Sequence, residues 1–128
     1  MSNNELSKTQ KMVLDNGYQG NALRVLCVCT VGMLRSPTLA NILNQHSGKY
    51  NARSAGIDEL ALIEVTEKLL YWTDWIIVMD YSTAQSIHDM GFDGVIYNFS
   101  VSDDYSYNDS VLIDIFNSRL ENIEQYRW

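Results

Sequence analysis

The sequence predicts an α/β fold in which a four-stranded parallel sheet carries helices on both faces. Short apolar stretches alternate with amphipathic stretches along most of the chain, which is the pattern of repeated strand–helix units. Right-handed crossovers between parallel strands place helices on both faces of the sheet. We expect the strand order 2-1-3-4, which puts the first strand in the interior beside a topological switch point. Ligands bind at such points, outside the carboxyl ends of the strands.

The strands are predicted from their apolar content. The first strand, at 23–28, is nearly continuously apolar, as expected of a central parallel strand that is buried on both faces. The second strand, at 50–54, is expected at an edge of the sheet. The remaining two strands are predicted at 75–79 and 94–98.

Four helices are predicted between and after these strands, at 37–45, 66–72, 82–90 and 110–126. Thr66 is a suitable N-cap for the second of them. Gly91 suits the position just after the third, where a left-handed backbone is common. The last helix has apolar residues on its expected buried side at Val111, Ile115, Leu120 and Ile123.

Length and composition predict one small domain at 23–128, preceded by an appendage at 1–22 that is either partly helical or a disordered arm. The 128 residues suffice for a single core. The net charge of −7 argues against nucleic acid or an anionic membrane as partners, because both require basic patches. The two cysteines, Cys27 and Cys29, are too close along one strand to form a disulfide framework, which fits a reducing compartment. No apolar run reaches membrane length and residues 1–10 are polar, so we expect a cytoplasmic protein.

The most informative motif is the stretch Cys29-Thr30-Val31-Gly32-Met33-Leu34-Arg35-Ser36-Pro37, which joins the first strand to the first helix. A cysteine and an arginine six positions apart, in a loop between a strand and a helix, predict a phosphate cradle with a nucleophile at its base. The loop's N–H groups and the helix N-terminus converge on an anion. The same positive field favours the thiolate form of Cys29.

Three further residues of this motif support the prediction. Arg35 can hold two phosphate oxygens with its planar guanidinium. Ser36 can donate a hydrogen bond to the Cys29 sulfur, and Pro37 fits the first turn of a helix, where an N–H group is not needed.

No group of residues has the spacing of metal ligands, so no metal and no cofactor is expected.

The motif resembles the loop of the low-molecular-weight protein tyrosine phosphatases, which ends in Arg-Ser-Pro. A second stretch, Ser102-Asp103-Asp104-Tyr105-Ser106-Tyr107-Asn108-Asp109, resembles the acid loop of this family, and in particular that of a short subgroup of predicted tyrosine phosphatases. Ser54-Ala55-Gly56 and Ile76-Ile77-Val78-Met79-Asp80 are further similarities. The resemblance covers residues 23–126.

The resemblance implies the fold of these phosphatases and the hydrolysis of a phosphomonoester, either a protein phosphotyrosine or a small phosphate ester. Cys29 would attack phosphorus, and Arg35 would bind the phosphate oxygens. Asp103 would protonate the leaving oxygen and then activate water. The phosphate would be bound by the loop residues Thr30, Val31, Gly32, Met33, Leu34, Arg35 and Ser36.

Several positions depart from the family pattern or leave a choice open. Gly32 stands where the family has an Asn that braces the loop, and Leu34 stands where many relatives have a second, protective cysteine. Asp104 is the alternative to Asp103 as the acid. Tyr105 and Tyr107 either flank the substrate or merely order their loop, and Ser54 and Asp80 either brace the site or serve as a turn residue and a helix cap.

Three other functions are to be weighed against this one. Arsenate reduction uses the same fold and loop, but it needs additional cysteines as a relay, and Cys27 is poorly placed for that role. A phosphate-binding or phosphotyrosine-binding module without catalysis is favoured by Gly32. The combination of Cys29, Arg35 and a candidate acid argues against such a module, because a binding module needs no nucleophile. A phosphocysteine carrier is disfavoured by the presence of Arg35 and the acid loop.

Overall fold

A single parallel sheet forms the centre of the protein. The computed structural model describes residues 21–30, 34–46, 48–61 and 63–128. The sheet has the order β2-β1-β3-β4, with strands β1 (Leu23–Cys29), β2 (Tyr50–Gly56), β3 (Trp75–Val78) and β4 (Val95–Asn98). All pairings are parallel. The predicted fold class and strand order are therefore confirmed, including the edge position of the second strand.

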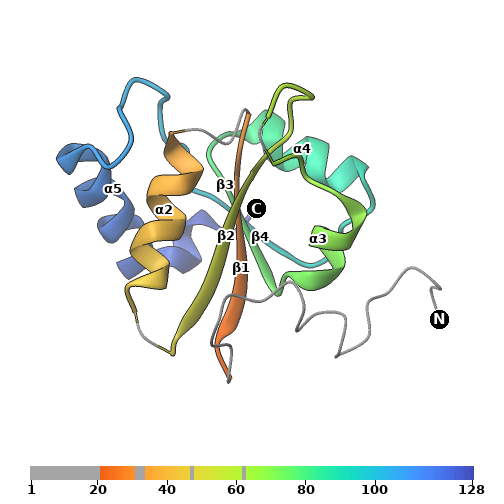
Figure 1. The fold of residues 1–128 in the computed structure, drawn as a ribbon, viewed down its shortest axis with the longest axis horizontal. Helices are drawn as coiled ribbons and strands as arrows, with labels where there is room; N and C mark the ends of the chain where they lie inside the picture. The colour runs from red at the N-terminus through yellow and green to blue at the C-terminus, as the bar shows by residue number, and fades with distance from the viewer. Residues whose placement is uncertain (1–20, 31–33, 47, 62) are drawn as a thin grey trace.

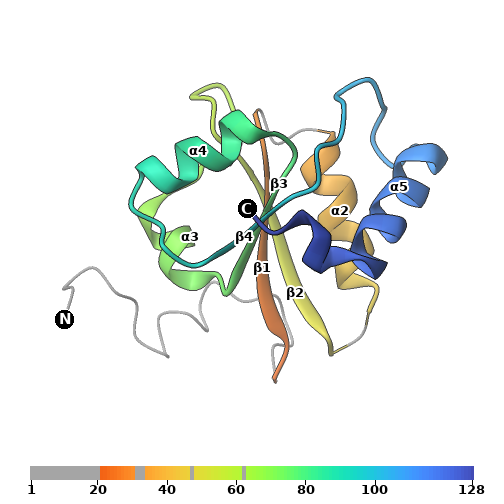
Figure 2. The same ribbon diagram turned by 180° about the vertical axis from the view of Figure 1, so that it is seen from behind.

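Helices cover both faces of the sheet (Figures 1 and 2). One face carries α2 (Arg35–Asn44) and α5 (Ser110–Glu121), and the other carries α3 (Glu67–Trp72) and α4 (Tyr81–Asp89). Each pair of helices closes its own hydrophobic core against the sheet. The loops that leave the carboxyl ends of β2 and β4 lie at the same end of the molecule as the start of α2, at the top of Figure 1.

The central strand β1 contributes side chains to both cores, because successive residues of a strand point to opposite faces. Val25, Cys27 and Cys29 belong to the core under α2 and α5. Leu26 and Val28 belong to the core under α3 and α4. All five are 3% exposed or less, so the strand is held rigidly up to its last residue, Cys29.

Two helices begin at side-chain caps. The Thr66 hydroxyl accepts a hydrogen bond from the Leu69 N–H at 3.2 Å, which confirms Thr66 as the N-cap of α3. The Asp80 carboxylate accepts one from the Thr83 N–H at 2.8 Å and caps α4. Gly91 follows α4 with φ of 96°, a left-handed conformation that favours glycine, as predicted.

The prediction of one helix over 110–126 was wrong. Helix α5 ends at Glu121, and a separate 3₁₀ turn, η1, spans Ile123–Tyr126. Asn122 leaves helical geometry between them, and its side chain donates to the Ser118 carbonyl at 3.1 Å, a local bond that competes with a continuing helix.

The buried side of α5 also differs from the prediction in part. Val111 is exposed, whereas Leu112 and Phe116 are the fully buried residues of the helix. The other predicted residues, Ile115, Leu120 and Ile123, pack partly buried against the same core.

Candidate active site

The predicted phosphate cradle lies where β1 ends and α2 begins. β1 continues through Cys29, and α2 begins at Arg35, two residues before the predicted start, so Pro37 lies in the first turn as expected. Val31, Gly32 and Met33 lie outside the described residues, and their predicted role in phosphate binding stays a prediction. Thr30 and Leu34, which flank them, are described.

The candidate nucleophile contacts the serine that the sequence pairs with it. Cys29 Sγ lies 3.1 Å from Ser36 Oγ, and both side chains are buried. Ser36 Oγ can also donate to the Ala55 carbonyl of the neighbouring strand, at 3.5 Å. A thiolate has no proton and can only accept, so an ionised Cys29 would accept a hydrogen bond from the Ser36 hydroxyl.

Arg35 is held by groups from two other loops. It is 8% exposed, and its Nη1 donates to the Val101 carbonyl at 2.8 Å. The same nitrogen lies 3.9 Å from Asp80 Oδ2. A guanidinium has five N–H donors in a fixed plane, so these two contacts orient Arg35 and leave further donors for an anion.

Asp80 serves both roles that the sequence left open, since it caps α4 and also faces Arg35. Burial alone would raise its pKa. The hydrogen bonds from the Thr83 side chain and backbone and from Ser82, together with the Arg35 charge, outweigh burial and lower the pKa of Asp80. Asp80 is thus held as an anion beside the guanidinium.

Backbone hydrogen bonds join the start of the cradle to the loop that follows β2. The Ile57 N–H donates to the Cys29 carbonyl at 3.2 Å, and the Asp58 N–H donates to the Thr30 carbonyl at 2.7 Å. These bonds extend the β1–β2 pairing beyond the ends of the strands. They fix the direction in which the chain leaves Cys29.

The predicted acid loop lies on the other side of the same end of the sheet. It follows β4, and its last part is tied to α2, because the Asn108 N–H donates to Thr38 Oγ1 at 2.9 Å. Ser100 and Asn108 have φ of 51° and 56°, which bend the chain at both ends of the loop. Val101, inside the first bend, supplies the carbonyl that holds Arg35.

The two candidate acids differ in their contacts. Asp104 accepts a hydrogen bond from the Ser102 hydroxyl at 2.7 Å and is thereby drawn back onto its own loop. Asp103 is exposed, and within the described part of the chain no hydrogen bond engages its carboxylate. This difference favours Asp103 as the group that is available to a substrate.

The two tyrosines of the loop also differ. Tyr105 packs partly buried against the core under α2 and α5, which fits a role in ordering the loop. Tyr107 is half-exposed and lines a hollow of about 360 Å³ together with Pro37 and Ser54. Of the two, Tyr107 is therefore the more exposed side chain, and the hollow that it lines begins at Pro37 in the first turn of α2.

Cys27 is inert by its surroundings. It is fully buried, and burial, with the neighbouring Cys29 as a smaller cause, raises the pKa of its thiol far above the ordinary range. It therefore stays protonated in the folded protein.

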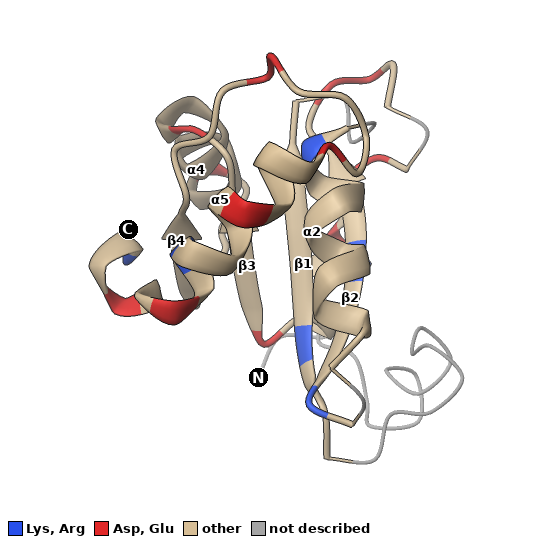
Figure 3. Cartoon of the chain, turned by 90° about the vertical axis from the view of Figure 1, so that its left-hand side faces the viewer, with Lys and Arg blue, Asp and Glu red and all other residues tan. Residues whose placement is uncertain are grey.

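Acidic residues surround the cradle. Figure 3 shows Asp and Glu positions in the loops that follow β2 and β4 and near the start of α4, at the same end as the start of α2. Arg35 is the one cation among the residues that the structure describes in these loops and helix starts.

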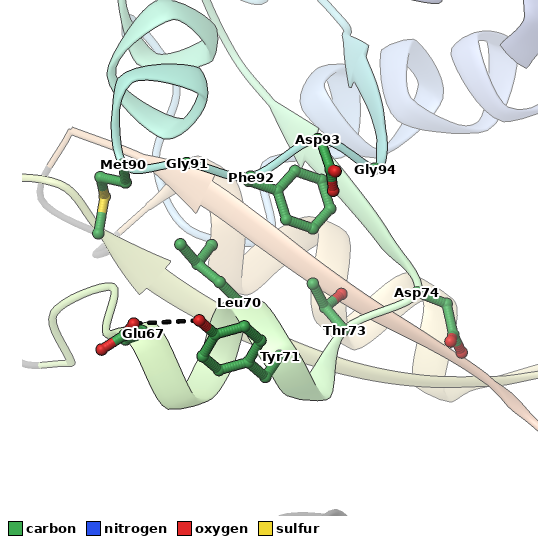
Figure 4. A pocket seen from close by; sticks show the side chains of 10 residues that line it. All are labelled: Glu67, Leu70, Tyr71, Thr73, Asp74, Met90, Gly91, Phe92, Asp93 and Gly94. Atoms are coloured by element: carbon green, nitrogen blue, oxygen red, sulfur yellow. Dashed lines mark hydrogen bonds between the residues drawn. The ribbon is translucent and has the colours of Figure 1, made fainter. Parts of the chain in front are cut away.

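A second hollow, of about 490 Å³, lies at the opposite end of the sheet and is remote from Cys29. Its walls come from α3 and from the turn before β4, with Leu70 facing Phe92 (Figure 4). The Tyr71 hydroxyl donates a hydrogen bond to the Glu67 carboxylate on the same wall. Neither a thiol nor an arginine lines it, so the cradle remains the candidate active site.

Within the residues described, no three His, Cys, Asp or Glu side chains gather closely enough to hold a metal ion. No helix in the described ranges combines the length and apolar character needed to cross a membrane.

Sequence reasoning missed one contributor to the site, the carbonyl of Val101. Backbone carbonyls carry no side-chain signal, so only the proximity of Val101 to the predicted acid loop hinted at its position. The sequence also left open which of two roles Asp80 has, because its contact with Arg35 depends on how β3 and β1 lie side by side.

Comparisons with solved structures match this fold to phosphatases. The tyrosine phosphatase Wzb from Escherichia coli K30 aligns with a TM-score of 0.62 at 18% identity, over 80% of this chain and 96% of that one. A low-molecular-weight phosphotyrosine phosphatase from Vibrio cholerae O395 aligns with a TM-score of 0.62 at 23% identity, over 81% and 97%.

The arginine phosphatase YwlE from Geobacillus stearothermophilus aligns with a TM-score of 0.61 at 14% identity, over 80% and 94%. Neither a scan of protein-family models nor a search of curated proteins found a match. The chain therefore has the fold of the low-molecular-weight protein tyrosine phosphatases, as the resemblance of its motifs predicts.

Proposed function

We propose that this protein hydrolyses phosphomonoesters through a phosphocysteine intermediate on Cys29. One observation carries the proposal: Cys29 Sγ, at the end of β1, lies 3.1 Å from Ser36 Oγ in the first turn of α2, next to Arg35, which the Val101 carbonyl holds. Two-step phosphoryl transfer requires a nucleophile, an anion-binding guanidinium and a carboxylic acid, the roles that this proposal gives to Cys29, Arg35 and Asp103. The shared fold supports the same reaction class.

In the first step, the Cys29 thiolate attacks phosphorus and forms the S–P bond while the bond to the leaving oxygen breaks. Arg35 and the N–H groups of the cradle bind the non-bridging oxygens and stabilise the charge of the transition state. Asp103, in its protonated form, gives its proton to the leaving oxygen.

In the second step, water attacks the phosphocysteine. Asp103, now a carboxylate, takes one proton from the water, the S–P bond breaks, and phosphate leaves while the thiolate is regenerated. The Ser36 hydroxyl, by donating to sulfur, stabilises the thiolate as the leaving group of this step.

Protein phosphotyrosine is the substrate that we propose. Tyr107 of the acid loop is half-exposed and lines a hollow together with Pro37, which directly follows the predicted cradle, so it offers an aromatic surface for a phosphorylated ring. One neighbour by fold is named as an arginine phosphatase, so phosphoarginine is the second substrate to compare.

Two other functions are less well supported. Arsenate reduction needs a reactive second thiol, and the only other cysteine, Cys27, is fully buried with a raised pKa. A non-catalytic phosphate-binding module would not need the Cys29–Ser36 contact, which has no role in holding a phosphate.

The direct test is release of phosphate from para-nitrophenyl phosphate. The wild-type protein should turn over, and Cys29→Ser should lose activity to background while keeping its circular dichroism spectrum. Arg35→Lys should lose most of both binding and turnover, because an ammonium group cannot present two parallel donors. Wild-type protein that binds phosphate without any turnover would instead favour the binding module.

A further inference from the structure

We propose that this site selects phosphorylated residues flanked by Lys or Arg, because the entrance to the cradle is built from acidic loops. The inference rests on the proposed phosphatase function and names the substrate class of the same site. It concerns charge around the phosphate and applies to any phosphorylated side chain.

The asymmetry of charge at the entrance is large. The segments 30–38, 56–66, 79–83 and 99–110 follow the four strands in the sequence and contain a single basic residue, Arg35. The same segments contain seven acidic residues: Asp58, Glu59, Glu64, Asp80, Asp103, Asp104 and Asp109. Of these, Asp103 is the proposed proton donor and the other six are carboxylates.

Short contacts hold these acidic segments next to the cradle. The loop of Asp58 and Glu59 is bonded to the carbonyls of Cys29 and Thr30. The backbone of Glu64 forms a β-bridge with Gly56, and Gly56 pairs with Cys29 between β2 and β1.

The other two acidic segments meet Arg35 and the first turn of α2. Asp80 lies 3.9 Å from the Arg35 guanidinium. The acid loop reaches Arg35 through the Val101 carbonyl and reaches α2 through the bond from Asn108 to Thr38. Three loops therefore bring carboxylates to the end of the sheet where Cys29 and Arg35 lie.

The one cation does not offset this field outside the cradle. Arg35 is buried at the base, with Asp80 beside it, so its charge acts on the bound phosphate and little on the residues that flank it. Acidic flanks would meet carboxylates of like charge, whereas basic flanks would meet complementary ones. Exposed pairs each change affinity by about 1.4-fold to 5-fold, so two or three of them give about a tenfold preference.

Glu59 and Glu64 allow the entrance to be changed without damage to the cradle. Both are exposed, and within the described ranges neither side chain is engaged in a hydrogen bond or an ion pair. By contrast, Asp58 and Asp109 hold their own loops by accepting bonds from Leu60 N–H and Val111 N–H, so they are unsuitable for substitution.

The test compares three phosphotyrosine peptides that differ only in having basic, neutral or acidic flanks. At an ionic strength of about 20 mM, kcat/KM should be about tenfold higher for the basic peptide than for the acidic one. At about 0.5 M the ratio should fall to within about twofold, because salt screens exposed charges. Equal values at low ionic strength, with turnover of para-nitrophenyl phosphate intact, would overturn this inference and leave the proposed function standing. Failure to turn over para-nitrophenyl phosphate would overturn both.

A pair of double variants locates the effect. Glu59→Lys with Glu64→Lys should abolish at least half of the preference, on a logarithmic scale, without changing turnover of para-nitrophenyl phosphate. Asp93→Lys with Glu121→Lys makes the same change in net charge at exposed positions on the opposite end of the molecule, and it should keep the preference. An equal loss in both variants would contradict the inference, because net charge and not the entrance would then set the preference.

Discussion

Ser36 has one hydroxyl proton and two acceptors within reach, the Cys29 sulfur at 3.1 Å and the Ala55 carbonyl at 3.5 Å. The shorter contact and the charge of a thiolate both favour the sulfur. Hydrogen bonds to charged groups contribute about 1.5–3 kcal/mol. A single buried hydroxyl is therefore expected to matter for the reactivity of the cysteine.

Removing that hydroxyl should weaken the nucleophile. We expect Ser36→Ala to reduce kcat by about tenfold or more and to slow alkylation of Cys29 by iodoacetate near neutral pH, because the thiolate loses a charge-assisted hydrogen bond. Both rates are measured on protein whose far-ultraviolet circular dichroism matches that of the wild type. Unchanged alkylation and turnover would show that Ser36 serves the Ala55 carbonyl and not the sulfur.

The assignment of the general acid is tested by the two neighbouring aspartates. Asp103→Asn should reduce turnover of a phosphotyrosine peptide by about 10²–10⁴, with a smaller loss for an ester whose leaving group is strongly acidic. Asp104→Asn should have a small effect that does not depend on the leaving group, because Asp104 is bound to Ser102. A leaving-group-dependent loss in Asp104→Asn alone would move the assignment by one residue.

Contacts within the candidate site were easier to predict from a local motif than contacts that reach it from distant parts of the chain. Cys29, Ser36 and Arg35 lie within eight positions of one another, so one short stretch of sequence was enough to pair them. The contact of Arg35 with Val101 joins residues 66 positions apart, and it exists only because the loop after β4 returns over α2. Such contacts depend on tertiary packing, which a single sequence does not specify.

At the scale of the elements, the N-terminus of α4 is linked to the cradle through Asp80. Asp80 caps this helix and also lies 3.9 Å from Arg35, so one carboxylate links helix stability to the orientation of the guanidinium. Thr66 caps α3 in the same way but contacts no residue of the cradle through that bond. The two caps therefore form a matched pair.

Replacing both caps by alanine in separate variants should separate the two roles. Asp80→Ala and Thr66→Ala should each lower the free energy of unfolding by about 0.5–2 kcal/mol, the usual effect of losing an N-cap. Only Asp80→Ala should also raise KM for para-nitrophenyl phosphate. Urea denaturation and steady-state kinetics measure the two effects. A raised KM in Thr66→Ala would mean that loss of a helix cap disturbs the cradle without the Arg35 contact.

Elements were predictable where a side-chain pattern marks them. The strands, the cap at Thr66 and the glycine after α4 were all found from local sequence. The end of α5 was not, because Asn122 breaks a helix whose apolar pattern continues into the 3₁₀ turn through Ile123. Ile123 and Tyr126 of that turn also pack against the core, so the apolar pattern in the sequence continues after the helix has ended.

At the scale of the whole molecule, the protonation of two buried groups, Cys27 and Tyr97, is coupled to folding. Burial, with the nearby Cys29 as a smaller cause, raises the pKa of the Cys27 thiol. Burial, with the hydrogen bond to Glu124 and the charge of Glu124, raises the pKa of Tyr97, and Arg127 opposes this only in part. Both groups stay neutral in the folded protein at a pH where the unfolded chain has begun to ionise.

Stability should therefore fall on the alkaline side. Above about pH 8.5, the ordinary range of a thiol, the unfolded chain loses the Cys27 proton while the folded protein keeps it. The unfolded state then binds fewer protons, so the free energy of unfolding decreases with rising pH, by at most about 1.4 kcal/mol per pH unit for each group. Urea midpoints at pH 7, 9 and 10 should show the decrease, and it should be shallower in Cys27→Ala. A flat profile would contradict the link.

The central claim is that phosphate passes through Cys29, and trapping the intermediate tests it most directly. The protein is mixed with a phosphotyrosine peptide, quenched in acid within milliseconds, digested and analysed by mass spectrometry. We expect a phosphate on Cys29 in the wild-type protein, a larger amount in Asp103→Asn with an activated ester, because hydrolysis of the intermediate is slowed, and none in Cys29→Ser. Turnover of the substrate without phosphate on Cys29 at any quench time, or with phosphate on another residue, would contradict the proposed mechanism.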